Sequence, residues 1–383
     1  MSTTAPRGFS AAGVAAGLKS SGDPDVAVVL NHGPDDAAAA VFTTNRFPAA
    51  PVLWSRQVLA GQRLRAVVLN SGGANACTGP EGFQDAHATA EHAAAALGVG
   101  AIDVAVASTG LIGVRLPMDK LTAGVTAAVG ALSEDGGPDA ARAIMTTDSV
   151  PKTTVQSRES WTVGGMAKGA GMLAPSLATM LVVLTTDAVV DASALGPALK
   201  QATSVSFERV DSDGCLSTND TVVVMASGAS GVTPSAEELT DALTAACTDL
   251  AMQLLADAEG STKDIAISVR NAASVEDALT AGRACARNNL LKTALFGNDP
   301  NWGRVLAAIG TTDAAFEPEQ VDVTINGVTV CRGGAIGDPR EGVDLTGRAI
   351  TIDVDLKAGP EQATIWTNDL SIAYVHENSA YST

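Results

Sequence analysis

WTVGGMAKGAGMLAPSLATMLVVLTT, residues 161–186, is the stretch around which the chain is organised. Its first half is dense in glycine, which allows unusual φ angles or a close approach of the backbone to another group. After Pro175, the apolar run Met180–Leu184 is bounded by a turn and by polar Thr185, which predicts a fully buried strand. Thr179 would be its first residue, directly after a segment that could hold backbone strain. The residues alone also allow an ordinary Gly-rich loop that leads into a core strand.

Length, composition and charge limit the class of protein. The chain has 383 residues, 46% of them hydrophobic, which is enough for two or three domains or two large layered halves. Aromatic residues are few (seven Phe, four Trp and two Tyr), so small aliphatic side chains must fill the core, which suits layers of sheet and helix. A net charge of −18 disfavours nucleic acid or an anionic membrane as a partner. No run reaches the roughly 18 apolar residues of a membrane span.

The cysteines and histidines give no sign of a metal site or a histidine triad. The five cysteines are scattered, with no CxxC pair and no histidine at metal-ligand spacing: Cys77, Cys215, Cys247, Cys285 and Cys331. They are expected to be reduced thiols in the core of a cytoplasmic protein. Residues 1–20 lack an apolar signal segment, so we expect a soluble, unexported chain. None of the four histidines accompanies a Ser or Cys motif.

The first half alternates short apolar segments with helical patterns. The expected strands are rich in β-branched residues and bounded by Gly, Asn or Ser: Val26–Leu30, Ala40–Thr43, Ala66–Leu69 and Val104–Ala107. Helices are expected over Gln84–Leu97, Asp119–Leu132 and Asp139–Met145.

The second half repeats this mixture of strands and helices. Strands are expected over Thr221–Met225 and wherever apolar residues alternate, as they do over 265–269 and 350–356. Ser235 and Ser274 have the pattern of helix N-caps, and Asn326-Gly327 predicts a hairpin turn. No flexible linker divides the chain, so a cut next to Thr179 would fall inside a folded unit.

Two of the predicted strands end in polar, Gly-containing loops, Asn70-Ser-Gly-Gly73 and Ser108-Thr-Gly110. Such a loop can direct successive backbone N–H groups at one point and so form a nest for an anion or an oxyanion. Each is equally compatible with an ordinary turn. The chain has neither a Walker-type phosphate loop nor a GxGxxG segment after a strand, which disfavours a nucleotide- or phosphate-binding protein.

Five motifs in order resemble the ornithine acetyltransferases of the ArgJ family, and the resemblance covers essentially the whole chain. They are the two loops above (70–75 and 108–113), the Gly-rich stretch with Ala178-Thr179-Met180-Leu181, FGNDPNWGR at 296–304 and ENSAYST at 377–383. The resemblance implies an α/β fold of the N-terminal-nucleophile type, with sheets packed between helices. It also implies self-cleavage into an α chain (1–178) and a β chain (179–383), an α2β2 assembly, and no metal or cofactor.

Cleavage before Thr179 would solve a chemical problem. A threonine hydroxyl is a poor nucleophile and needs a base, which its own α-amine can provide once the preceding peptide bond is broken. That amine has a reference pKa of about 7.7–8.0, so a neutral fraction exists near pH 7. In the precursor, the same hydroxyl would attack the carbonyl of Ala178, and water would then release the resulting ester.

The resemblance also implies roles for residues of the site. Thr109 and Gly110 would stabilise the oxyanion, and Asn70, Gly72 and Gly73 would form the neighbouring wall. The residues implied in substrate binding are Thr146 or Thr147, Lys168, Thr179, Glu259 against the amine of ornithine, Asn378 and Thr383. Asn301 and Arg304, which belong to a motif of the family, are expected to have a structural role near the site and no part in the chemistry.

The activity implied by the resemblance is transfer of acetyl from N2-acetyl-L-ornithine to L-glutamate in arginine biosynthesis. Some members of the family also use acetyl-CoA, and the residues leave this second activity open. The alternative is an aminopeptidase of a related fold, whose N-terminal nucleophile is serine.

Overall fold

The computed structural model describes residues 2–174 and 180–380. The first sheet of the larger lobe has the order β1-β2-β4-β5, in which only β4 and β5 are parallel neighbours. Its strands are β1 (Phe9–Val14), β2 (Val26–Asn31), β4 (Ala66–Ser71) and β5 (Val104–Thr109). Because parallel neighbours end at the same edge, the loops after β4 and β5 lie side by side, as the register Ser71↔Thr109 shows.

The second sheet has five strands in the order β3-β9-β8-β7-β6. They are β3 (Ala38–Phe42), β6 (Lys152–Ser157), β7 (Thr162–Lys168), β8 (Leu181–Thr186) and β9 (Thr221–Ala226). The antiparallel neighbours β7 and β8 come before and after the proposed cut in the sequence, so the two chains that the cut would produce share one sheet. Side chains of β8 alternate between two cores, since Leu181 packs toward the first sheet while Val182 packs on the opposite face.

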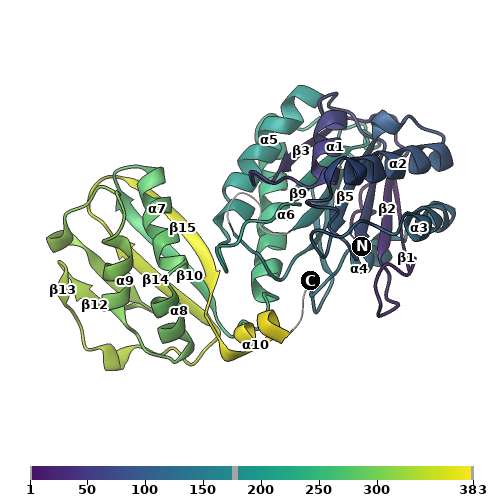
Figure 1. Ribbon diagram of the computed structural model, residues 1–383. Helices are drawn as coiled ribbons and strands as arrows, with labels where there is room; N and C mark the ends of the chain where they lie inside the picture. Colours follow the sequence, from purple (N-terminus) through teal and green to yellow (C-terminus); the bar gives the residue numbers. More distant parts are fainter. Residues whose placement is uncertain (1, 175–179, 381–383) are drawn as a thin grey trace.

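Helices cover the outer face of each sheet in the larger lobe. α1 (Ala50–Leu59), α2 (Gly79–Leu97) and α3 (Met118–Gly130) pack on the first sheet, and α5 (Ala192–Ser204) and α6 (Ala236–Ala256) on the second. α4 (Gly137–Ala143) packs against β1 and β2. The larger lobe thus has four layers, helices, sheet, sheet and helices (Figure 1). This is the layered α/β fold that the sequence resemblance implied.

Glycines in β7 allow close packing that side chains would prevent. A Cβ on Gly164 would lie 2.2 Å from the carbonyl oxygen of Ser2, and one on Gly165 would lie 2.7 Å from Leu184. Gly169, just after the strand, has a φ of 154°. The glycine-dense segment is therefore partly a core strand, in which glycine is required by its neighbours.

The smaller lobe has a separate core around a six-stranded sheet of order β13-β12-β11-β14-β10-β15. Its strands are β10 (Asp264–Ala272), β11 (Asp322–Ile325), β12 (Val328–Arg332), β13 (Ala335–Ile336), β14 (Ala349–Asp355) and β15 (Glu361–Asn368). Its helices are α7 (Val275–Ala286), α8 (Asn289–Phe296) and α9 (Trp302–Ile309). The Asn-Gly hairpin turn is confirmed, with positive φ at both Asn326 and Gly327.

Polar contacts join the two lobes. Arg287, directly after α7, pairs with buried Asp211 at 2.8 Å, and the Asn368 side chain donates to the carbonyl of Leu255 at 3.1 Å. After β15, helix α10 (Ile372–Ala380) runs from the smaller lobe back toward the larger one (Figure 1). Asn378 of α10 thereby lies in the same cavity lining as Gly72 and Thr109, at the edge where β4 and β5 end.

Most of the predicted elements are confirmed, with shifted ends. The four predicted strands of the first half are β2 to β5, the three helices are α2 to α4, and the N-caps Ser235 and Ser274 begin α6 and α7. β8 begins at Leu181, and Thr179 lies outside the described residues. All five cysteines are free, but the expectation of core thiols is wrong for Cys77 and Cys215, which are exposed.

Candidate active site

A cavity of about 510 Å³ lies at the edge where β4, β5 and β7 end. Its charged lining residues, within the described ranges, are Lys19, Lys168 and Glu259. Its other lining residues include Gly72, Thr109, Gly110, Thr146, Thr147, Gly171 and Asn378. The structure therefore brings together predicted residues that are spread over more than half of the chain.

The peptide between Thr109 and Gly110 is held in one orientation. The carbonyl oxygen of Thr109 accepts hydrogen bonds from Gly72 N and Gly73 N, each at 3.0 Å. In a planar trans peptide the C=O and N–H point in opposite directions, so the Gly110 N–H faces away from residues 72 and 73. A Cβ on Gly110, whose φ is 131°, would lie 2.6 Å from Gly73 N, so only glycine fits.

The same bonds correct one expectation from the sequence. We expected the backbone N–H groups of Asn70-Ser-Gly-Gly73 to form a nest for an anion. This expectation is wrong for the two glycines, because their N–H groups donate to the carbonyl oxygen of Thr109. The Asn70 amide instead joins the two loops, donating to Gly73 O at 3.0 Å and accepting from Ser108 at 2.6 Å. These residues support the Thr109-Gly110 loop.

Lys168, at the end of β7, extends a buried ammonium group toward this loop. Its Nζ donates to Thr146 Oγ1 at 2.6 Å and to Thr109 Oγ1 at 3.4 Å, and it lies 3.9 Å from a carboxylate oxygen of Asp148. Burial lowers the pKa of Lys168, while Asp148 opposes that effect. Because Lys168 donates to the Thr109 oxygen, the Thr109 hydroxyl hydrogen remains able to donate to another group.

A chain of buried charges lies behind Lys168. Asp148 accepts from Lys152 Nζ at 2.7 Å and from the backbone of Gly169 at 2.6 Å, and Lys152 also reaches Asp257 at 2.6 Å. Burial alone would raise the pKa of Asp148, but the ammonium groups of Lys168 and Lys152 and the Gly169 N–H bring it to about 2. The network connects the Lys168 side of the cavity to the end of α6, two residues before Glu259.

Two glycines, Gly171 and Gly260, leave the space in which Glu259 and its loop pack. A Cβ on Gly171 would lie 2.6 Å from a carboxylate oxygen of Glu259, and the Glu259 N–H donates to Ala170 O at 2.9 Å. At the next residue, a Cβ on Gly260 would lie 2.2 Å from the backbone N of Tyr374 in α10. The Glu259 loop therefore packs between the end of β7 and the C-terminal helix.

The remaining predicted residues fall into three groups. Thr146 and Thr147 both line the cavity, as does exposed Asn378 of α10. Asn301 and Arg304 lie in the smaller lobe and are absent from the cavity lining; Asn301 bonds to Asp299 and Arg304 to the carbonyl of Leu290. Ala178, Thr179 and Thr383 lie outside the described residues.

Two residues that the sequence analysis did not select hold the site together. The amide of buried Asn219 donates to Ala74 O at 2.6 Å and to Ser108 O at 2.8 Å, which connects β9 to both loops. Fully buried Asp220 accepts from Met180 N at 3.0 Å, directly after Thr179 in the chain, and burial raises the pKa of Asp220 well above its usual value. Their only sequence signal is a polar pair before the apolar strand β9.

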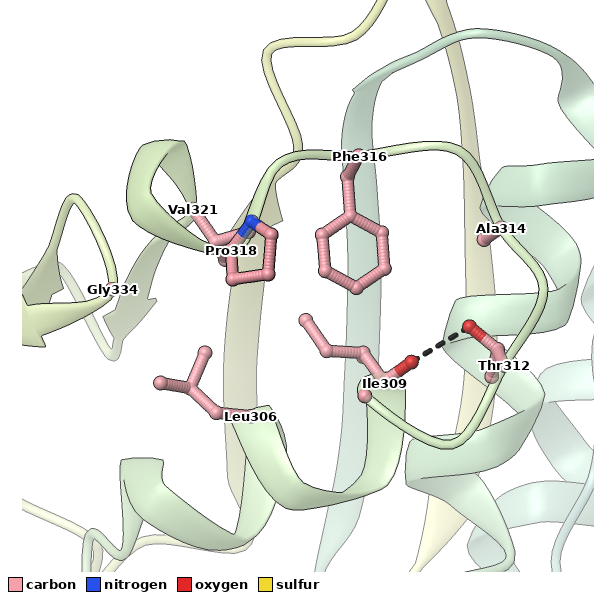
Figure 2. A pocket seen from close by; sticks show the side chains of 9 residues that line it. Leu306, Ile309, Thr312, Ala314, Phe316, Pro318, Val321 and Gly334 are labelled. Atoms are coloured by element: carbon pink, nitrogen blue, oxygen red, sulfur yellow. Dashed lines mark hydrogen bonds between the residues drawn. The ribbon is translucent and has the colours of Figure 1, made fainter.

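A second cavity, of about 290 Å³, lies in the smaller lobe between α9 and the segment before β11 (Figure 2). Leu306, Ile309 and Phe316 are among its lining residues, which include no charged group, and the Thr312 hydroxyl shown there is bonded to Ile309 O at 2.7 Å. Its described lining therefore has no acid or base that could activate this hydroxyl for group transfer. Across residues 2–174 and 180–380 no cluster of metal-ligating side chains is found, and no helix there is long and apolar enough to cross a membrane.

The four layers, with a charged cavity where their strands end, define a protein of the layered α/β class. The ArgJ family model matches residues 10–383. The arginine biosynthesis bifunctional protein ArgJ of Streptomyces coelicolor is 64% identical over 382 residues, covering 100% of both chains. The ArgJ protein of Mycobacterium tuberculosis is 58% identical over 387 residues, covering 99% of this chain and 96% of that one. This chain belongs to the ArgJ family.

Two solved structures are also similar to parts of the chain. Ornithine acetyltransferase from M. tuberculosis, complexed with ornithine, has 62% sequence identity and a TM-score of 0.45, covering 47% of this chain and 96% of that one. The ArgJ protein of Bacillus halodurans has 35% identity and a TM-score of 0.49, covering 51% of this chain and 97% of that one.

Proposed function

We propose that this chain transfers acetyl from N2-acetyl-L-ornithine to L-glutamate through an ester on Thr179. Membership of the ArgJ family makes it an acyltransferase of arginine biosynthesis. The observation that carries the finer proposal is the cavity in which the Thr109-Gly110 loop, Lys168 and Glu259 meet. It offers donors for an oxyanion beside groups of both charges, as an amino-acid substrate requires.

Maturation cuts the chain between Ala178 and Thr179. The Thr179 hydroxyl attacks the Ala178 carbonyl carbon, the C–N bond breaks, and the acyl group moves to oxygen as an ester. Water then hydrolyses the ester, which leaves a carboxylate on Ala178 and a free α-amine on Thr179. The hydrogen bond from Met180 N to Asp220 supports this proposal, because it fixes the backbone next to the nucleophile.

In the mature enzyme the α-amine of Thr179 takes the proton of its own hydroxyl as that oxygen attacks the acetyl carbonyl. The Thr109 hydroxyl and the Gly110 N–H stabilise the oxyanion, a type of contact that typically lowers the barrier by about 2.7–4 kcal/mol per donor. The C–N bond then breaks, and ornithine leaves with the proton. The α-amine of glutamate attacks the acetyl ester in the reverse sequence, which regenerates the Thr179 hydroxyl.

Substrate binding uses the charges of the cavity. Lys168, with Thr146 and Thr147, holds the α-carboxylate that donor and acceptor share, and Glu259 pairs with the side-chain amine of ornithine. Asn378 and Thr383 hold further polar groups of the amino acid. The burial of Lys168 supports this assignment, since a carboxylate can restore the electrostatic stabilisation that the ammonium group lost with its water.

The two chains remain joined after the cut and pair into an α2β2 assembly in the cytoplasm. Support for their association comes from the sheet, in which β7 of one chain and β8 of the other are hydrogen-bonded neighbours over Val163–Lys168. Native mass measurement tests the assembly, and an αβ pair that does not associate further would contradict α2β2.

The decisive experiment is mass measurement of the purified protein with and without acetylornithine. We expect two fragments, the larger beginning at Thr179 and gaining one acetyl group that glutamate then removes. Thr179→Ala should stay whole and inactive, whereas Thr179→Ser should retain some cleavage and transfer. A fully active, uncut wild-type chain would contradict the mechanism.

Steady-state kinetics test the order of events. One nucleophile that serves donor and acceptor in turn predicts parallel double-reciprocal plots. Intersecting plots with no acetylated β chain after rapid quenching would exclude the covalent route. Peptide hydrolysis without acetyl transfer would instead favour the aminopeptidase alternative, and an acetyl-CoA assay with glutamate tests the second donor separately.

A further inference from the structure

The cavity contains one cation more than the proposed reaction has used. Lys19, on the loop between β1 and β2, lines the same cavity as Lys168 and Glu259. We propose that Lys19 binds the side-chain carboxylate of the acceptor and so selects a dicarboxylic amino acid. This inference rests on the proposed function, which concerns the donor, the nucleophile and the shared carboxylate.

Apart from the α-nitrogen, which is acetylated in the donor and a free amine in the acceptor, the charges of the two substrates differ only at the end of the side chain. Acetylornithine has an α-carboxylate and a side-chain ammonium, so Lys168 and Glu259 match its two charges. Glutamate has the same α-carboxylate but a second carboxylate in place of the ammonium, and this group cannot pair with Glu259. A site that accepts both in turn needs a second cation, and Lys19 is the remaining cationic side chain in the described lining.

The loop that presents Lys19 is a built structure. Fully buried Asp25 accepts backbone N–H bonds from Ala16 and Leu18, both at 2.6 Å, and from Lys19 at 3.0 Å. Lys120 of α3 donates to Gly17 O at 2.8 Å on the same loop. Three backbone donors on one carboxylate fix the path of the loop and hence the origin of the Lys19 side chain.

The loop also packs directly on the wall of the site. A Cβ on Gly72 would lie 2.9 Å from the Cβ of Leu18, so glycine at position 72 lets the loop reach the Thr109-Gly110 region. Residues 18–21 therefore form one side of the cavity, while Lys168 and Glu259 lie on elements from later in the chain.

The ammonium group of Lys19 is suited to bind an anion. It is partly buried and donates to Pro24 O at 2.9 Å, while an ammonium group has three N–H donors. Burial lowers the pKa of Lys19 in spite of nearby Asp25 and Asp23, and the charge of Lys168 acts in the same direction as burial. A carboxylate bound at Lys19 would oppose both effects, because it favours the charged form of the ammonium group.

The test compares Lys19→Met with the wild type, using glutamate, glutamine and acetylornithine as probes. Met keeps the apolar stem and removes the charge. We expect the KM for glutamate to rise roughly 10- to 100-fold, because a charged hydrogen bond is lost, and the KM for acetylornithine to change far less. The preference for glutamate over glutamine should fall by a similar factor, and Lys19→Arg should restore most of it.

Lys120→Met is the matched control, because Lys120 supports the same loop from outside the cavity. It should leave the preference for glutamate unchanged. Equal changes in Lys19→Met and Lys120→Met would show that Lys19 only supports the loop, and an unchanged glutamate preference in Lys19→Met would overturn the inference. A wild-type enzyme that does not transfer acetyl from acetylornithine would instead contradict the proposed function, so the two failures are distinguishable.

Discussion

The two lysines of the cavity are held in different ways. Lys168 is only 2% exposed, and two hydroxyl groups and the Asp148 carboxylate surround its ammonium group. Lys19 is partly exposed, and its loop is fixed through backbone bonds to Asp25, while its own ammonium group bonds to one carbonyl. The ammonium group of Lys168 is therefore held by three side chains, whereas that of Lys19 is held by its loop and a single carbonyl.

This difference matches the two tasks that we propose. A group that binds the same α-carboxylate in both half-reactions gains from being held rigidly, because its ordering is complete before the substrate arrives. A group that meets only the acceptor must allow the ornithine side chain to occupy the same space, and a long side chain whose end is held by one carbonyl can move aside. The comparison predicts that changes at Lys168 affect both substrates and changes at Lys19 affect one.

The largest effect, a loss of stability, is expected from a change at Asp148, the carboxylate next to Lys168. Asp148→Asn keeps the shape but leaves Lys168 and Lys152 without the carboxylate between them. Breaking a buried charge pair in this way typically costs about 3–5 kcal/mol, so chemical denaturation should show a loss of that order. Asp139→Asn, which removes an exposed pair with Arg142, is the control and should cost less than about 1 kcal/mol. Equal losses in both variants would contradict a structural role for the buried network.

The same residue predicts a dependence of stability on pH. The pKa of Asp148 is about 2 in the folded protein, below the usual value of 3.8. A lowered carboxyl pKa stabilises the folded state above pH 4, and this contribution is lost as the pH falls from about 4 to about 2. The pKa difference corresponds to about 2 kcal/mol. The difference in unfolding free energy between wild type and Asp148→Asn should therefore narrow across this range, and a constant difference would show that the carboxylate charge is unimportant.

Lys168→Met tests directly whether Lys168 serves both substrates. It removes the ammonium group that contacts Thr109 and Thr146, so we expect kcat/KM to fall roughly 100-fold or more with either substrate varied, as is typical for a buried hydrogen-bonded charge. Lys200→Met, at an exposed position of α5, should have no effect. A fall in kcat/KM for only one of the two substrates would contradict the different roles that we propose for Lys168 and Lys19.

Local sequence patterns predicted the strands that lead to the site, and they failed where packing overrides propensity. β4, β5 and β8 are apolar and β-branched, so their existence follows from local sequence. β7 contains Gly164 and Gly165, which weaken a strand pattern, and the reason for them is contact with Ser2 and Leu184, which are distant in sequence. α5 contains Pro197, which obscured a helix that the Asp191 N-cap begins.

The resemblance supplied the predicted site residues, and their supports were missed for a physical reason. Lys152 and Asp257 form one ion pair across 105 residues, and Asn219 reaches the carbonyl of Ser108 across 111. Such contacts leave no periodicity in the sequence. Lys19 likewise lies in a loop whose form depends on Asp25, six residues later, and nothing in the spacing of these charges indicates a binding group.

The smallest effect is expected at Glu259, the residue that we propose binds the side-chain amine of the donor. Glu259→Gln keeps the shape and removes the negative charge, so the KM for acetylornithine should rise roughly tenfold, the lower end for a charged hydrogen bond. Self-cleavage should continue, because the peptide before Thr179 does not need this charge, and Glu237→Gln, exposed in the first turn of α6, is the control.

If Glu259 and Lys19 serve opposite substrates, Glu259→Gln should leave the preference for glutamate over glutamine intact, whereas Lys19→Met should lower it. Loss of that preference in Glu259→Gln would show that the two charges act as one unit and that the division between donor and acceptor is wrong. A failure to cleave would give Glu259 a structural role.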